Sequence, residues 1–156
     1  MRALAVQQRT VWHPNTPAER SEFISSTDSR VPAGLPVQTD VVRIISGRDH
    51  QPVPSERVPT INDSTLIVSS AWVIHDPNCQ AEVHGVLRFI YSTDVPSFWY
   101  QVGDSIPISD KWAKCYGYAK SKEVQGTGIT PYFALNNTFD TLCTWFVADD
   151  QITLTP

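Results

Sequence analysis

Apolar and polar residues alternate along much of the chain after residue 60, with the two-residue period of a strand that is buried on one face. In one such stretch Val83, Gly85, Leu87, Phe89 and Tyr91 fall on the same face. Runs rich in Asp, Asn, Gly and Pro separate the stretches and are typical of turns. The segments predicted to be strands are Leu66–His75, Glu82–Ser92, Phe98–Val102, Ile106–Ile108, Trp112–Lys120, Thr130–Leu135, Thr138–Val147 and Gln151–Thr155.

The number and spacing of these segments predict the fold class. About eight short strands in fewer than a hundred residues are typical of two packed antiparallel sheets. We therefore predict an all-β fold, an antiparallel β-sandwich of about eight strands, with a jelly-roll-like arrangement favoured because a jelly roll has that strand count. The strand order does not follow from the pattern, so an immunoglobulin-like topology and a small barrel stay open.

The first 59 residues have a different chemistry, because they hold seven of the chain's 12 prolines and all but one of its arginines. Proline lacks a backbone donor and biases the residue before it toward extended structure, so most of this region is not expected inside a regular sheet. A short helix is predicted over residues 17–24, with Pro17 at its first position, and a strand over residues 41–46. We therefore divide the chain into an extended N-terminal arm, residues 1–59, and a β-sandwich body, residues 60–156.

Charge and composition exclude several classes of partner. The net charge of -4 and the pI of about 5.4 give no general attraction for nucleic acid or anionic membranes. No apolar run has the length of a membrane span, and no signal peptide is evident at the N-terminus. The odd number of cysteines, Cys79, Cys115 and Cys143, argues against a disulfide framework and for a reducing intracellular compartment during assembly.

No group of residues in the sequence has the signature of an active site. His75, Cys79 and His84 could supply three zinc donors, but their spacing matches no common zinc pattern and a fourth ligand is missing. Neither a Gly-x-Ser-x-Gly turn nor a glycine-rich phosphate loop occurs. We therefore predict no enzymatic activity, no metal and no cofactor. A small hydrolase that uses loop carboxylates on a β scaffold is kept as a second alternative.

The arginines of the arm suggest contacts with protein. Glutamate and aspartate residues are interleaved with them, so the arm is near neutral and lacks the dense positive charge by which nucleic acid is packaged. Scattered arginines suit bidentate contacts with carboxylates and carbonyls on a neighbouring subunit, and Trp12 could anchor in a pocket there. The predicted subunit-interface residues are Arg2, Arg9, Trp12, Arg20, Phe23 and Arg30.

A second candidate surface is aromatic. On the predicted strand Trp112–Lys120, small residues alternate with Trp112, Lys114, Tyr116 and Tyr118. A partly exposed aromatic face of this kind is what a sugar-binding or protein-binding surface needs. Trp112, Tyr116 and Tyr118 are therefore the candidate ligand-binding residues.

The leading functional hypothesis is a structural assembly protein: a viral capsid, decoration or other virion subunit whose arm contacts neighbouring subunits of a homo- or hetero-oligomer. It rests on the β-rich pattern, the arm and the missing catalytic signature, and its viral part is an analogy from architecture. The expected location is the virion. The first alternative is a carbohydrate-binding or adhesion module that uses the aromatic face.

Overall fold

The computed structural model describes residues 2–5, 20–46, 53–54, 66–75, 86–93, 99–105, 111–120, 129–136 and 143–155. In these residues the strands are β1 Arg2–Ala5, β2 Arg20–Ile24, β3 Val41–Ser46, β4 Val53–Pro54, β5 Leu66–His75, β6 Val86–Thr93, β7 Trp99–Ser105, β8 Ala113–Lys120, β9 Ile129–Asn136 and β10 Cys143–Thr155. The pairings among them are antiparallel. The same residues contain no helix that is long and apolar enough to cross a membrane.

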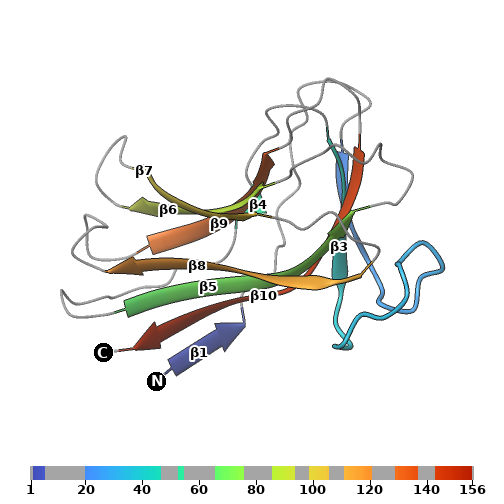
Figure 1. Cartoon of the computed structure of the whole chain (residues 1–156), viewed down its shortest axis with the longest axis horizontal. Helices are drawn as coiled ribbons and strands as arrows, with labels where there is room; N and C mark the ends of the chain where they lie inside the picture. The colour runs from blue at the N-terminus through green and yellow to red at the C-terminus, as the bar shows by residue number, and fades with distance from the viewer. Residues whose placement is uncertain are drawn as a thin grey trace.

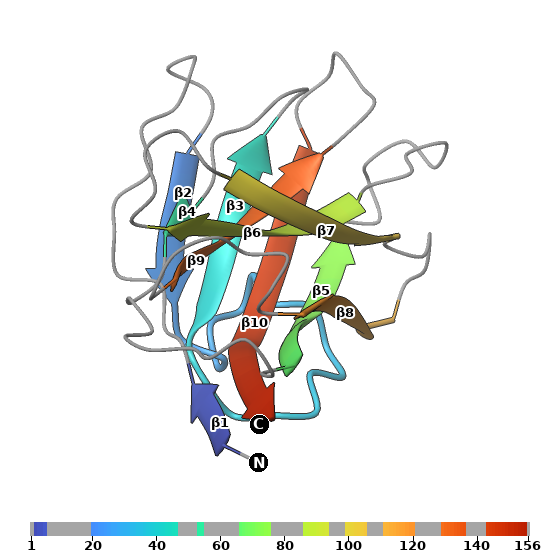
Figure 2. The ribbon, with the colours of Figure 1, turned by 90° about the vertical axis from the view of Figure 1, so that its left-hand side faces the viewer.

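The strands form two sheets that face each other. Sheet A has the strand order β2-β3-β10-β5-β8, with β1 paired to the far end of β10. Sheet B has the order β4-β9-β6-β7. Figure 1 shows sheet B above the part of sheet A that contains β5 and β8, and in Figure 2 β6 and β7 run across the direction of β3 and β10. The described strands therefore form the predicted antiparallel β-sandwich.

The longest strand, β10, joins two parts of sheet A. Its residues 143–148 pair with β3 and its residues 151–154 pair with β1, while β5 lies along its other edge on both sides of a bulge. The bulge lies between Ala148 and Gln151, where Asp149 has a φ of 52°. Aspartate adopts this left-handed backbone more readily than most residues, and bulges bend strands. The bend, visible in Figure 1, lets one strand serve two partners along a single edge.

The face of sheet A that points toward sheet B forms an apolar core. Trp145 is fully buried and lies between Ile44 of β3 and His75 of β5 in the sheet register. The His75 and Trp145 rings meet edge to face, with centroids 5.5 Å apart and planes at 70°. Cys115, expected to act as a small apolar residue, is buried on this face as well. Strands β3, β5, β8 and β10 are thus mostly apolar on their inner side, where Ser69 and His75 of β5 are buried polar residues.

Part of the opposite face of sheet A is covered by the irregular segment between β2 and β3, residues 25–40, which we term the crossing segment. Its Val31 and Leu35 pack against a second apolar cluster. That cluster consists of Ile24, Val41, Ile74, Trp112, Phe146 and Ala148. Gly34 has a φ of 92°, a conformation that glycine adopts without steric cost and that lets the segment turn. Strand β5 is therefore buried on both faces over much of its length, which explains its nearly continuous apolar sequence.

In the second half of the chain the described strands agree well with the prediction. Strand β5 has the predicted bounds, and the ends of β6, β7, β8 and β9 differ from the predicted ones by a few residues. Two separate strands were predicted over Thr138–Val147 and Gln151–Thr155, and this is wrong for their described residues. Residues 143–155 form the single strand β10, because Asp149 lies in a bulge and not in a turn, while residues 138–142 lie outside the described part. The predicted strand Ile106–Ile108 lies outside the described residues.

The first 59 residues differ more from the prediction. Residues 20–24 form β2 and not the end of a helix over 17–24, because β2 pairs with β3 residue by residue and buries Ile24. Cross-strand pairing here outweighs the local helix-start signal, while residues 17–19 lie outside the described part. The strand predicted over residues 41–46 is confirmed as β3. Among the described segments of this region, β1, β2 and β3 belong to sheet A and β4 belongs to sheet B. The division of the chain at residue 59 stays a prediction.

Candidate functional site

Strand β8 lies at an edge of sheet A and has two different faces. The face toward sheet B carries the small buried residues Cys115, Gly117 and Ala119. The outer face carries the long side chains Lys114, Tyr116, Tyr118 and Lys120, which we term the lysine–tyrosine strip. Burial alternates along the strand as the sequence pattern predicted, since small residues fit under sheet B and long polar ones reach solvent.

The two tyrosines of the strip form an exposed aromatic surface. Tyr116 is 38% exposed and Tyr118 is 58% exposed. Their ring centroids are 6.3 Å apart and their planes differ by only 14°. Side chains two positions apart on a strand stand on the same face about 6.6 Å from each other, so the strand itself sets this spacing. Two near-parallel rings with hydroxyl tips offer a ligand both an apolar surface and hydrogen-bonding groups.

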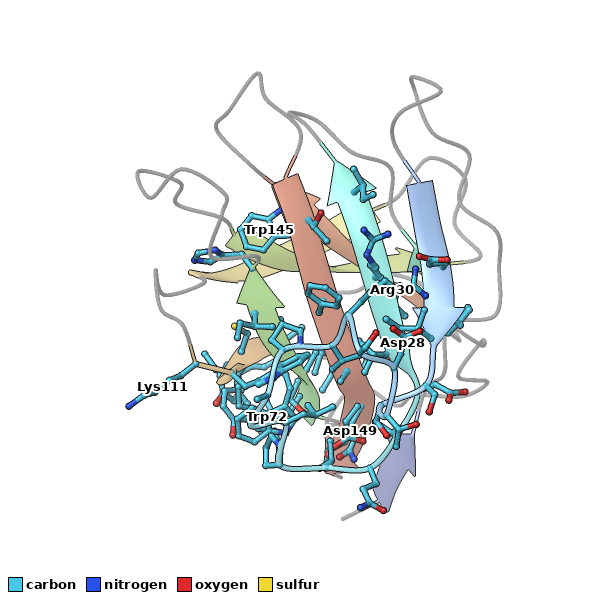
Figure 3. All side chains as sticks on the ribbon, turned by 90° about the vertical axis from the view of Figure 1, so that its right-hand side faces the viewer. Asp28, Arg30, Trp72, Lys111, Trp145 and Asp149 are labelled. Atoms are coloured by element: carbon cyan, nitrogen blue, oxygen red, sulfur yellow. The ribbon has the colours of Figure 1, made fainter. Side chains whose placement is uncertain are left out.

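Lys114 lies between the tyrosine pair and a tryptophan. Its Nζ is 5.8 Å from the ring centroid of Trp72 and 5.8 Å from that of Tyr116. Trp72 is directly opposite Lys114 in the β5–β8 register, and it packs against the second apolar cluster. Aromatic rings attract a cation through their π-electrons. Trp72 and Tyr116 therefore hold the Lys114 ammonium at one end of the strip, and Figure 3 shows Trp72 at this corner of sheet A.

Trp112 is not part of the exposed aromatic surface, although it shares a face with the tyrosines. It is only 8% exposed and belongs to the second apolar cluster. Its indole N–H donates a hydrogen bond of 3.1 Å to the carbonyl oxygen of Pro32 in the crossing segment. Trp112 thus fastens the crossing segment to β8. The alternation of the sequence gave its face correctly, but a segment distant in sequence covers it.

Charged side chains fasten the crossing segment near β2 and β3. The Arg30 guanidinium donates to both carboxylate oxygens of Asp28, at 3.0 and 2.8 Å. It also donates to Glu22 Oε1 at 2.8 Å, and Arg43 donates to the same oxygen at 3.0 Å. Glu22 and Arg43 are direct neighbours in the β2–β3 register. One carboxylate on the sheet therefore connects a strand arginine with an arginine of the segment. We term Glu22, Asp28, Arg30 and Arg43 the charged clamp; Figure 3 labels its residues Asp28 and Arg30.

These contacts shift the titration of the pair Asp28 and Arg30. The side-chain hydrogen bonds from Arg30, followed by its backbone N–H bond of 2.9 Å to Asp28 Oδ1, lower the pKa of Asp28 from 3.8 to about 2. The same side-chain hydrogen bond raises the pKa of Arg30 above its ordinary value. Both groups therefore stay charged through the neutral pH range, so the ion pair between Asp28 and Arg30 persists there.

The residues predicted to form a subunit interface are not gathered in one place. Arg30 pairs with Asp28 and Glu22 of its own chain. Phe23 lies on edge strand β2, at the opposite end of sheet A from β8, and is 38% exposed. Arg2 and Arg20 are in β1 and β2, and Arg9 and Trp12 lie outside the described residues. These positions remain predictions as interface residues.

The histidine and cysteine residues considered as zinc ligands cannot be assembled from the described part of the chain. His75 is buried in the inner core beside Trp145, and Cys79 and His84 lie outside the described residues. Among the residues that the structure describes, no group of three or more His, Cys, Asp or Glu side chains could hold a metal ion.

The fold is similar to that of carbohydrate-binding modules. The CBM22-1 and GH10 modules of endo-1,4-β-D-xylanase 10B from Clostridium thermocellum, complexed with xylohexaose, match 93% of this chain at a TM-score of 0.58 and 11% identity. The CBM22-1 xylan-binding domain of Xyn10C from Paenibacillus barcinonensis matches 92% of this chain and 85% of its own length, at a TM-score of 0.57 and 11% identity. The CBM22-2 xylan-binding domain of the same protein matches 92% of this chain and 91% of its own length, at 0.56 and 16%.

At the level of sequence, no family profile and no curated protein matches the chain. The chain spans only 26% of the length of the Clostridium thermocellum chain. Together with a CBM4 structure, at a TM-score of 0.53, these neighbours confirm the β-sandwich prediction.

The same neighbours overturn the prediction of a viral capsid, decoration or other virion subunit, because they are carbohydrate-binding modules. The physical reason for the error is that an antiparallel sandwich hosts many unrelated functions, so an analogy from architecture carries no functional specificity.

Sequence reasoning found the tyrosines of the strip but missed the role of Trp72. The position of Trp72 opposite Lys114 follows only from the β5–β8 register. Lys120, at the far end of the strip, was also missed. The two-residue period from Lys114 through the tyrosines to Lys120 is visible in the sequence and could have revealed it.

Proposed function

We propose that this chain is a carbohydrate-binding module that holds a polysaccharide against Tyr116 and Tyr118 without chemically changing it. The observation that carries the proposal is the exposed, near-parallel tyrosine pair on the outer face of sheet A. The similarity in fold to modules named as xylan-binding supports it. Xylan and other β-linked polysaccharides are therefore the first ligands to test.

The chemistry of the tyrosine pair suits a sugar chain. The C–H groups on the faces of a pyranose ring are apolar and pack on an aromatic ring, while the sugar hydroxyls need hydrogen-bond partners at the edge. Tyrosine offers both, and it loses little conformational entropy on binding because it has only two side-chain torsions. The strand spacing of the two rings presents them side by side to an extended chain.

The described strands around the pair are suited to binding and carry no pair of carboxyl groups for hydrolysis. Glycoside hydrolysis generally needs two carboxyl groups on either side of the bond that is cleaved. The described strands next to the pair, residues 66–75 and 111–120, contain no aspartate or glutamate. The proposal therefore assigns this surface to recognition alone and sets aside the hydrolase alternative.

Binding of soluble xylan and of a mixed-linkage β-glucan, measured by affinity electrophoresis and calorimetry, tests the proposal. Tyr116→Ala and Tyr118→Ala should each weaken binding about tenfold, which corresponds to about 1.4 kcal/mol. Phe23→Ala is the matched control, because Phe23 is an aromatic residue with the same 38% exposure as Tyr116 but lies on the far edge strand. Failure of the unaltered protein to bind any neutral or acidic polysaccharide would refute the function. Equal loss in all three variants would refute the site.

A further inference from the structure

Three of the chain's four lysines lie on or next to strand β8, which carries the proposed binding surface. The whole sequence has four, and they are Lys111, Lys114, Lys120 and Lys122. Lys114 and Lys120 belong to the lysine–tyrosine strip, Lys111 is exposed just before β8, and Lys122 lies outside the described residues. Figure 3 shows the Lys111 side chain pointing away from the sheet. A chain with a net charge of -4 thus gathers every lysine within 12 positions, 111–122.

No carboxylate accompanies these lysines on the two strands that form the surface. Residues 66–75 and 111–120 include three lysines and no aspartate or glutamate. The carboxylates Glu22 and Asp28 are engaged by arginines beside β2 and β3, at the other end of sheet A. Asp149 lies on β10, beyond β5, and its Oδ1 accepts a hydrogen bond of 2.9 Å from the Gln151 side chain. The described residues of the β5–β8 surface therefore carry lysines and no carboxylate, on a protein that is acidic overall.

The lysines of the strip lie at both ends of the tyrosine pair. Lys114, Tyr116, Tyr118 and Lys120 follow one another on the same face of β8, so the strip is about 20 Å long at roughly 3.3 Å per residue. The ammonium of Lys114 is held over Trp72 and Tyr116 at 5.8 Å from each ring centroid. A ligand chain that rests on the two tyrosine rings would therefore pass an ammonium group on either side.

From this arrangement we propose that the ligand is an acidic polysaccharide, whose sugar faces pack on Tyr116 and Tyr118 and whose uronate carboxylates pair with Lys114 and Lys120. This proposal rests on the proposed function and specifies its ligand class. An ammonium group donates up to three hydrogen bonds and is a compact positive charge. Carboxylates spaced along a flexible polymer can meet such point charges without the fixed geometry that a guanidinium requires.

A structural explanation of the lysines predicts something different. Lysines on an exposed edge strand discourage pairing with another sheet and so prevent aggregation. In that case replacement of the lysines would raise aggregation and leave ligand preference unchanged. The two explanations therefore differ in a measurable quantity, which is the ratio of affinities for acidic and neutral forms of the same polymer.

The test compares glucuronoxylan and polygalacturonate with their carboxyl-reduced forms, in which each uronate has become a neutral sugar. The unaltered protein should bind at least one acidic polymer about tenfold more tightly than its reduced form at 20 mM NaCl, as expected when two to three exposed ion pairs each contribute about twofold to fivefold. The preference should shrink strongly at 500 mM NaCl, where screening acts over only about 4 Å. Dextran sulfate serves as a third probe, and binding as tight as that of the uronate polymers would overturn the assignment to carboxylates.

Variants of the strip make the test specific. Lys114→Gln and Lys120→Gln should each reduce affinity for the acidic polymer about twofold to fivefold and leave affinity for the reduced polymer unchanged. Lys114→Arg and Lys120→Arg keep the charge and should retain the preference for the acidic form. Static light scattering of each variant monitors aggregation.

The outcomes separate this proposal from the proposed function. Equal binding of acidic and reduced polymers, with sensitivity to Tyr118→Ala, would overturn the acidic ligand and leave a carbohydrate-binding module. Aggregation of the glutamine variants with an unchanged affinity ratio would assign the lysines to protection of the edge. Absence of binding to all of the polymers would remove the function and this inference together.

Discussion

The outer face of sheet A has a covered part and an open part. Over β10, β3 and the end of β5 near Trp112, the crossing segment buries Ile74, Phe146 and their neighbours in a second apolar cluster. Along β8, Tyr116 and Tyr118 on the same face stay exposed. Both parts are built from alternating strands, so alternation alone does not distinguish a core from a binding surface. The difference is made by residues 25–40, which cross one part and leave the two tyrosines of the other part exposed.

The largest effect should come from the residue at the border between the two parts. Trp112→Ala should lower the free energy of unfolding by about 3–4 kcal/mol, because it removes a buried aromatic side chain and leaves a cavity beneath the crossing segment. Urea denaturation followed by circular dichroism measures it. Trp112→Phe keeps most of the packing and loses the hydrogen bond to Pro32, so its cost should be only about 1 kcal/mol. A loss below 1 kcal/mol in the alanine variant would mean that the covered part is not a core.

The charged clamp of the covered part should contribute less to the free energy of unfolding than Trp112 does. Glu22→Gln removes the carboxylate that Arg30 and Arg43 share, and we expect a loss of about 0.5–1 kcal/mol because the cluster is partly exposed. Asp40→Asn, at an exposed carboxylate of the same segment, is the control and should change stability by less than about 0.5 kcal/mol. Equal effects in the two variants would show that net charge, and not the shared contact, is what matters.

Acid should weaken the clamp in a defined pH range. The pKa of Asp28 is about 2 in the folded protein, below its ordinary value of 3.8. A carboxylate with a lowered pKa stabilises the fold fully above its unfolded pKa, and this stabilisation is lost as the pH falls through the folded value. The midpoint of urea denaturation should therefore fall between about pH 4 and pH 2, and Asp28→Asn should show a smaller fall. Parallel pH profiles for the two proteins would contradict the role of the Arg30 contact.

The smallest effect on stability should come from the open part. Tyr118 is 58% exposed, so Tyr118→Ala should change the free energy of unfolding by less than about 0.5 kcal/mol while it weakens ligand binding. Thermal unfolding with and without polysaccharide separates the two quantities. A loss of stability close to that of Trp112→Ala would place Tyr118 with the covered part and remove the contrast between the two.

Much of the sandwich could be predicted from the sequence, because burial on one face imposes a two-residue period. This is why β5 was found with its bounds and why the faces of β8 were assigned correctly. The region before residue 60 was harder to predict. Its prolines and arginines favour irregular structure, yet β2 and β3 pair with each other and join sheet A. Pairing partners distant in sequence decided that outcome, and no local pattern reports them.

The candidate site likewise has features that the sequence predicts and features that it does not. The sequence by itself determined that Lys114, Tyr116, Tyr118 and Lys120 share a face, because alternation is a local property of any strand. Only the tertiary structure decided that Trp112 is buried under Pro32 and that Trp72 holds Lys114. Those contacts join residues 80 and 42 positions apart, which only the path of the crossing segment and the β5–β8 register bring together. Exposure, and with it the choice between core and binding surface, is set by what else in the folded chain covers a side chain.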